Sequence, residues 1–225
     1  MGRAHFNSAS FLGAARDIAL ESGPAGVTVG SVTQRLGAPT GSFYHRFASR
    51  DVLLGELWLA TALAFQEDYL AAIETGHGLA AALHTPVWVR AHFDDSCLLL
   101  LYHRNDFVHG DWPEPLKRGV ALQAQRVDAG YEKFARDTLG GTNPEQLRIA
   151  QFVLADVPKA AVIPHLRRRE PPPPFVDELI RLTYSALVRD CSANNRRIEH
   201  RRGEELSDEG SRRQRPPGHL LKKRR

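Results

Sequence analysis

Apolar residues recur along most of the chain at the three- and four-residue spacing of amphipathic helices, and the alternation typical of strands is scarce. Gly23-Pro24, Gly37 and Gly76 punctuate the first third of this pattern, as expected where helices end. Ser49, followed by Asp51, is a natural N-cap for a long helix. The helices expected in this part are 8–22, 28–36, 39–47 and 49–75.

The same periodicity continues to about residue 190, with less distinct helix ends. The helices expected here are 79–92, 94–108, 113–139, 144–157 and 173–189. A run of four prolines precedes the last of them. The pattern therefore predicts an all-α protein, in which an N-terminal group of three short helices precedes a larger helical domain.

Between Val27 and Phe47 the sequence reads VTVGSVTQRLGAPTGSFYHRF, which has the layout of a helix-turn-helix. Thr28 can cap the first helix, Gly37 can adopt the left-handed conformation of a sharp helix end, and Pro39 suits the first turn of the next helix. Phe43 and Phe47, four residues apart, are expected to turn inward. The residues left near the outer face, small and polar enough to enter a major groove, are Thr40, Gly41, Ser42, Tyr44 and His45.

With Gly26-Val27-Thr28-Val29, the Gly37-Ala38-Pro39 turn and the run from Gly41 to Phe47, the chain resembles the TetR-type (tetracycline-repressor-like) transcriptional regulators. Ser49-Arg50-Asp51, followed by Leu53-Leu54, extends the match to about residue 57. The resemblance implies a homodimer that binds a palindromic operator in double-stranded DNA and a C-terminal domain that binds a small molecule. It implies phosphate contacts from Thr28, Tyr44 and Arg50, base contacts from Thr40, Ser42 and His45, and close backbone approach at Pro39 and Gly41.

One departure from the family pattern is Val32-Thr33, where an aliphatic residue followed by Ala is usual. A hydroxyl at this tight helix crossing is expected to tilt the recognition helix slightly. Each proposed contact also has a plainer interpretation, since Tyr44 and His45 are residue types common on exposed helix surfaces and Arg50 could be an ordinary helix-end charge.

Three segments are expected: a helix-turn-helix DNA-binding domain (1–50), an effector-binding and dimerisation domain (51–191), and a basic, disordered tail (192–225). The formal net charge of +4 comes from the tail, because residues 194–225 contain 11 Lys or Arg against 5 Asp or Glu. Composition alone therefore does not indicate DNA binding by the folded part.

Aromatic and polar residues that could line a ligand cavity concentrate between residues 79 and 139. The candidates chosen for the effector site are Trp88, His92, Tyr102 and Phe107. The alternative is that these aromatic residues only fill the core. The expected dimer interface combines Leu147, Ala150, Gln151, Leu154 and Ala155 with Phe175, Leu179, Leu182, Tyr184 and Ala186.

No catalytic motif is found, so no enzyme activity, cofactor or metal is expected. Glu74 and His77 have the spacing of a di-iron ligand pair, but the pair occurs once, and a cluster of His103, Asp106 and His109 is more simply coincidence. The two cysteines, the short apolar runs and the polar N-terminus favour a cytoplasmic protein with no membrane partner, and the excess of arginine over lysine favours a bacterial source. The alternative function is a helical ligand-binding or enzymatic protein whose helix-turn-helix no longer binds DNA.

Overall fold

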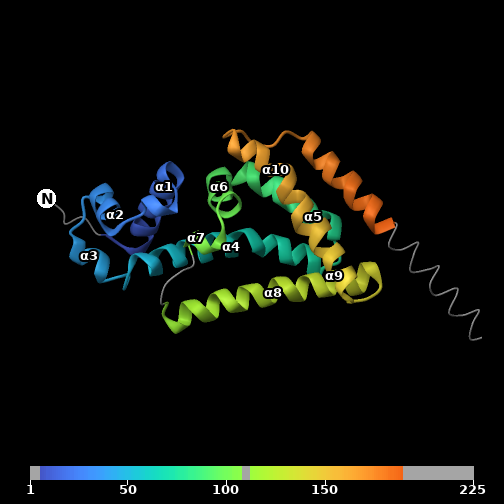
Figure 1. The fold of residues 1–225 in the computed structure, drawn as a ribbon, viewed down its shortest axis with the longest axis horizontal. Helices are drawn as coiled ribbons and strands as arrows, with labels where there is room; N and C mark the ends of the chain where they lie inside the picture. The colour runs from blue at the N-terminus through green and yellow to red at the C-terminus, as the bar shows by residue number, and fades with distance from the viewer. Residues whose placement is uncertain (1–5, 108–111, 190–225) are drawn as a thin grey trace, which may run out of the picture.

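The computed structural model describes residues 6–107 and 112–189, which form helices and connecting turns with no strand among them. The first four helices lie along the chain much as the apolar pattern predicts (Figure 1). The labelled elements are α1 (Ser8–Ser22), η1 (Pro24–Gly26), α2 (Val29–Leu36), α3 (Thr40–Tyr44), α4 (Arg50–Glu74), α5 (Gly78–Ala91), α6 (Phe93–Leu101), α7 (Arg104–Phe107), α8 (Glu114–Leu139), α9 (Pro144–Gln151), η2 (Phe152–Asp156) and α10 (Val157–Arg167). A last helical segment covers residues 175–189.

α1, α2, α3 and the start of α4 pack around one cluster of buried aromatic and aliphatic residues. Phe11 contacts Phe43 and Phe47 through ring edges, with centroids 5.8 and 6.1 Å apart. All three rings are at most 1% exposed. This small aromatic core fixes α3 against α1 and so determines which residues of α3 remain outside.

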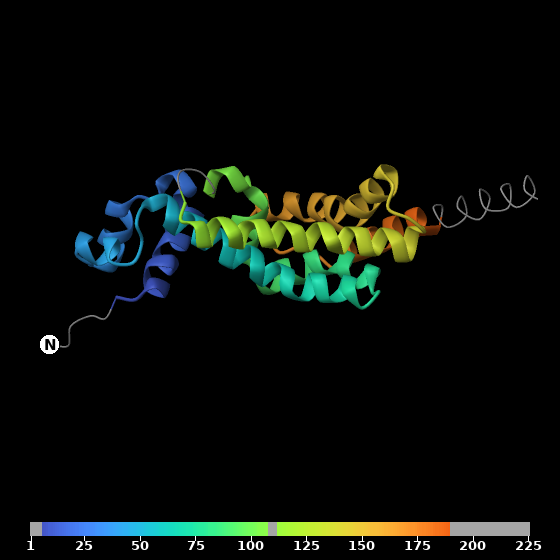
Figure 2. The same ribbon diagram turned by 90° about the horizontal axis from the view of Figure 1, so that it is seen from below.

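The long helices α4 and α8 run side by side and form the axis of the larger domain (Figure 2). α5 and α6 lie against α10, and α9 lies against α8. A second hydrophobic cluster fills the space between them, with Leu70, Leu139, Leu154 and Ile180 almost fully buried. The 25-residue helix α4 therefore contributes to both clusters and connects the small N-terminal group to the larger domain.

Two expected helices differ from the structure. The helix expected over 94–108 is interrupted at Tyr102 and His103, and Asp106 accepts a hydrogen bond from the His103 amide at 2.7 Å to begin the separate turn α7. The helix expected to end near Val157 instead continues to Arg167 through Pro158 and Pro164. A π-helical segment, η2, precedes Pro158 and accommodates it.

The continuous helix from Pro144 to Arg167 has 24 residues and is long and apolar enough to cross a membrane by length and composition. It contains buried core residues such as Val153 and Leu166, and also the charged residues Arg148, Asp156 and Lys159. The helix lies within the larger domain and packs against α5, α6 and α8. It is therefore a core helix of the bundle. The tail expected at 192–225 lies outside the described residues.

Candidate nucleic-acid interface and effector cavity

Both ends of α2 are fixed by local features of its sequence. Thr28 Oγ1 accepts from the Ser31 amide, and Ser31 Oγ accepts from the Thr28 amide, both at 2.9 Å, which forms a capping box. Gly37 ends α2 with φ 62°, a left-handed conformation that favours glycine. The Thr33 hydroxyl donates to the Val29 carbonyl at 2.8 Å. The departure at Thr33 is therefore accommodated by a bond within its own helix.

α3 presents one face to solvent. Phe43 is 0% exposed, whereas its neighbour Tyr44 is 58% exposed and touches Phe43 only through a ring edge. The predicted contact residues Thr28, Pro39, Thr40, Gly41 and His45 are also exposed, and Ser42 is half-buried. An exposed tyrosine beside small polar side chains on a short, rigidly supported helix can reach phosphates and base edges.

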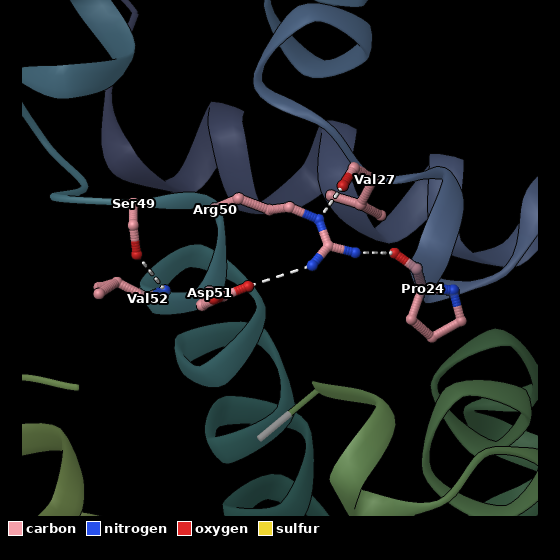
Figure 3. Close-up of polar contacts among 6 residues, drawn as sticks. All are labelled: Pro24, Val27, Ser49, Arg50, Asp51 and Val52. Atoms are coloured by element: carbon pink, nitrogen blue, oxygen red, sulfur yellow. Dashed lines mark hydrogen bonds and ion pairs between the residues drawn. The ribbon is translucent and has the colours of Figure 1, made fainter. Parts of the chain in front are cut away.

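Arg50 lies at the N-terminus of α4, but its guanidinium points toward the chain between α1 and α2 (Figure 3). It donates to the carbonyl oxygens of Val27 and Pro24, the latter at 2.8 Å, and pairs with Asp51 at 3.1 Å. These contacts hold the loop that precedes α2. The phosphate contact expected of Arg50 stays a prediction, and the structure assigns the side chain a positioning role within the domain.

Arg46 was not singled out from the sequence, yet it also braces α3. Its guanidinium donates to the Ser42 carbonyl at 2.8 Å and to the Phe6 carbonyl, and lies 5.7 Å from the centre of the Phe11 ring. The hydrogen bond to Ser42 fixes the Arg46 side chain along α3, and the cation–π contact with Phe11 connects it to α1. In the sequence, only the pair Arg46-Phe47, which follows Phe43 closely, indicates this role. The contacts that Arg46 makes depend on how the helices pack together.

Residues 11–57 match the model of the bacterial regulatory proteins of the tetR family. A solved structure from Shewanella sp. PV-4, assigned to the tetR family of transcription regulators, has the same fold with a TM-score of 0.53. It is 15% identical, and the alignment covers 84% of this chain and 95% of that one. Residues 11–57 are therefore similar to the tetR family of bacterial regulatory proteins, and the likeness to the Shewanella structure shows the fold of the chain. No curated protein is a significant match to the sequence.

The four residues predicted for the effector site lie in two separate pairs. Trp88 and His92 stack on α5 with centroids 5.1 Å apart. Tyr102 and Phe107 meet edge to face at 6.2 Å near α7, where both pack on the N-terminal cluster. The structure does not bring the four into one cavity, because the break at Tyr102 turns α7 toward the DNA-binding helices.

A cavity of about 100 Å³ lies instead between α4, α5, α6, α8 and the η2–α10 helix. Its lining residues are Phe65, Gln66, Tyr69, Thr85, Leu100, Val127, Tyr131, Leu154, Ala155 and Lys159. Trp88 reaches it only indirectly, through an edge contact with Phe65 at 5.2 Å. The cavity is mostly apolar with a few polar groups, as small-molecule sites usually are.

Two tyrosine hydroxyls provide the polar centre of this cavity. The Tyr69 hydroxyl lies 3.4 Å from the Tyr131 hydroxyl and 3.3 Å from the Leu154 carbonyl oxygen. Burial raises the pKa of Tyr69 well above its ordinary value, and Asp156 adds to the effect. Burial likewise raises the pKa of Tyr131. Both side chains therefore stay protonated and neutral at physiological pH.

A second, more open cleft of about 480 Å³ separates the DNA-binding helices from the larger domain. Tyr102, Asn105 and Asp106 line one side, and Pro24 and Arg50 line the other. No cluster of three His, Cys, Asp or Glu side chains suited to a metal occurs in the part of the chain that is described, although His109 lies outside it.

Proposed function

We propose that this TetR-type regulator is a repressor that acts as a homodimer in the bacterial cytoplasm and leaves its operator when a small molecule binds the larger domain. The observation that supports DNA recognition is the exposed face of α3, where Tyr44 is 58% exposed beside Thr40 and His45 on a helix anchored by Phe43. The observation that supports a sensor is the apolar cavity with a buried tyrosine pair.

The proposed roles on α3 separate phosphate contacts from base contacts. Tyr44→Phe should weaken binding to all DNA sequences similarly, because phosphate contacts position the protein without reading the sequence. His45→Ala and Thr40→Ala should change the preferred bases, with a loss of about 1–3 kcal/mol for each good base contact.

Selection from a random double-stranded oligonucleotide pool with the full chain tests these roles. A palindromic consensus should emerge with the unaltered protein and with Tyr44→Phe, and it should shift for the other two variants. If the unaltered protein selects no consensus, the alternative of a helical ligand-binding protein with a non-functional helix-turn-helix is favoured. A consensus changed by Tyr44→Phe alone would reverse the assigned roles.

α4 provides the proposed route from the cavity to the DNA-binding helices. Phe65 and Tyr69 line the cavity, and Arg50 at the other end of the same helix holds the loop before α2. A ligand that tilts α4 would change the spacing of two recognition helices that must reach grooves about 34 Å apart. The ligand can lower operator affinity only as far as it prefers the DNA-free conformation over the DNA-bound one. Couplings of about 1–3 kcal/mol, or roughly 5–150-fold in DNA affinity, are usual.

The proposed dimer interface is narrower than the sequence suggests. Ala150 and Leu154 are 0% exposed in the core of their own chain, which removes them from any partner contact. Phe175, Leu179 and Leu182 are 59, 51 and 57% exposed, at helical spacing in the last helix. An apolar stripe of this kind is the surface that we assign to the partner subunit.

A further inference from the structure

The wall of the cavity has an unusual backbone whose cause lies in the sequence. In an α-helix the carbonyl of Leu154 would accept the amide of residue 158, but that residue is proline and has no amide hydrogen. The helix widens into the π-helical segment η2, in which the Val157 amide donates to the Phe152 carbonyl five residues before it. Segments of this kind occur often at functional sites.

The Leu154 carbonyl, which has no amide hydrogen at position 158 to accept, lies 3.3 Å from the Tyr69 hydroxyl, which is itself 3.4 Å from the Tyr131 hydroxyl. Tyr69 has one hydroxyl proton and can donate it to only one of these neighbours at a time. If the Tyr69 hydroxyl donates to the Leu154 carbonyl, the Tyr131 hydroxyl donates to Tyr69. The lone pairs of the Tyr131 oxygen can then accept a hydrogen bond from a ligand. If the Tyr69 hydroxyl donates to Tyr131, the Tyr131 hydroxyl proton can instead be donated to a ligand. A ligand hydroxyl, which both donates and accepts, fits either arrangement.

The surroundings of the two hydroxyls disfavour a negative charge on the ligand. Burial is the main cause that raises the pKa of both tyrosines. Tyr131 and then Asp156 raise the pKa of Tyr69 further, whereas for Tyr131 the hydrogen bond from Tyr69 opposes the effect of burial and Asp156 and Asp128 add to it. Lys159 is the one charged residue among the lining residues, and it is exposed. A charge placed in the buried part would therefore lose its hydration without gaining a buried partner.

Size and access are consistent with one ring. An apolar cavity of about 150 Å³ is enough for benzene, and this cavity measures about 100 Å³ before any side chain moves. Tyr131 also lines an outer cleft of about 450 Å³ together with Asp128, Glu132, Leu147, Arg148 and Gln151. A rotation of the Tyr131 ring would join the cleft to the cavity and enlarge the inner space. The aromatic faces of Phe65 and Tyr69, 5.7 Å apart and nearly parallel, form one side of that space.

From these features we infer that the cavity binds a small uncharged phenol, a single aromatic ring whose hydroxyl forms a hydrogen bond with Tyr131 beside Tyr69 and whose ring packs on Phe65. The inference names the class of effector for the site in the proposed function and rests on that proposal for any effect on DNA. Binding itself is independent of DNA and can be measured alone.

Isothermal titration of the full chain with three probes tests the inference: phenol, toluene and benzoate. Phenol should bind saturably, and at least about tenfold more tightly than toluene, which lacks the hydroxyl, because a hydrogen bond in a buried site is worth about that factor. Benzoate, ionised at pH 7, should bind more weakly than phenol. Tyr131→Phe should weaken phenol binding about tenfold, and Ala155→Leu, which fills the cavity, should abolish it.

Tyr184→Phe is the matched control, since this half-buried tyrosine packs on Phe134 and does not line the cavity. It should bind phenol like the unaltered protein. Equal affinity for phenol and toluene, tighter binding of benzoate, no saturable phenol binding, or phenol binding that survives Ala155→Leu would each overturn the inference.

Failure of this inference can be distinguished from failure of the proposed function. Phenol binding with the expected variant pattern, but without any change in operator affinity, would keep the ligand class and refute release by a ligand. A protein that selects no DNA consensus yet binds phenol would keep the ligand class and refute the DNA-binding role. A protein that binds its operator but no phenol would refute only the ligand class.

Discussion

Arg50 lies where the tetR-type pattern places a phosphate contact, yet its guanidinium faces the Pro24 and Val27 carbonyls. The sequence shows that an arginine occupies this position of the motif, but it does not predict the direction of the side chain. That direction depends on how the loop before α2 folds back onto α4, which is a tertiary contact between residues 23 to 26 positions apart. Tyr44 is the opposite case, because the inward spacing of Phe43 and Phe47 already indicated that Tyr44 lies outside.

Arg50→Ala distinguishes the two roles. If the guanidinium holds the loop, its loss leaves two carbonyls without their charged donor and should destabilise the protein by about 2–3 kcal/mol. Thermal unfolding and DNA affinity would then fall together. Arg35→Ala is the control, because Arg35 pairs with Glu21 at an exposed site where such pairs contribute little to stability. An unchanged melting temperature with weakened DNA binding would instead establish the phosphate contact.

His84 predicts a dependence of stability on pH. Its Nε2 lies 2.7 Å from the Phe65 carbonyl oxygen, so this nitrogen donates in the neutral ring. Burial lowers its pKa below the ordinary value, opposed by the Phe65 hydrogen bond and Asp68, and assisted by His92. The unfolded chain therefore takes up a proton first, and stability present above about pH 6.5 should decline as pH falls through that value.

Replacing His84 with Gln keeps an N–H donor for Phe65 and removes the titration. Melting temperatures measured from pH 8 to pH 5 should fall less steeply for His84→Gln than for the unaltered protein. Curves that stay parallel over this range would show that another group is responsible.

At the scale of elements, capping residues predicted the helix limits well, but the end of the helix that begins at Pro144 was predicted wrongly. α1 and α2 begin and end where the polar caps and glycines indicated, because these signals act within a few residues of chain. The helix expected to end near Val157 instead continues through Pro158 and Pro164. Packing of Val162 and Leu166 in the core offsets the local cost of proline, and periodicity alone does not reveal that packing.

Pro158→Ala tests whether this proline maintains the π-helical segment. The new amide can donate to the Leu154 carbonyl, so the segment should tighten toward an α-helix and withdraw that carbonyl from Tyr69. Hydrogen exchange should show a protected amide at position 158. Pro164→Ala, in the same helix but without a π-helical segment before it, is the control and should leave Tyr69 and the cavity unchanged.

At the scale of the whole molecule, the sequence predicted the all-α class and the division between a DNA-binding end and a larger domain, but not the cavity. Helical spacing shows which face of a helix is apolar and leaves open which helices face one another. Trp88, His92, Tyr102 and Phe107 were reasonable candidates by composition, yet the lining residues come from α4, α8 and η2 as well as α5. Phe65 and Tyr69 on α4, which line the cavity, were not among these candidates.

The final prediction concerns assembly. Phe175, Leu179 and Leu182 form an exposed apolar stripe on the last helix, and burying such a stripe against a second copy removes it from water. A palindromic operator is bound tightly only when two recognition helices contact it together, so loss of the dimer should weaken operator binding more than any single phosphate contact. Leu179→Glu places a charge in the middle of the stripe and should produce a monomer.

Sedimentation velocity over a range of concentrations, with operator affinity measured on the same samples, provides the measurement. Leu122→Glu is the matched control, because Leu122 is 60% exposed on α8, away from the stripe on the last helix. It should remain a dimer with unchanged operator affinity. If the Leu179→Glu protein stays dimeric, the dimer interface lies on another surface. If it becomes monomeric yet binds the operator as tightly as before, a single recognition helix is sufficient.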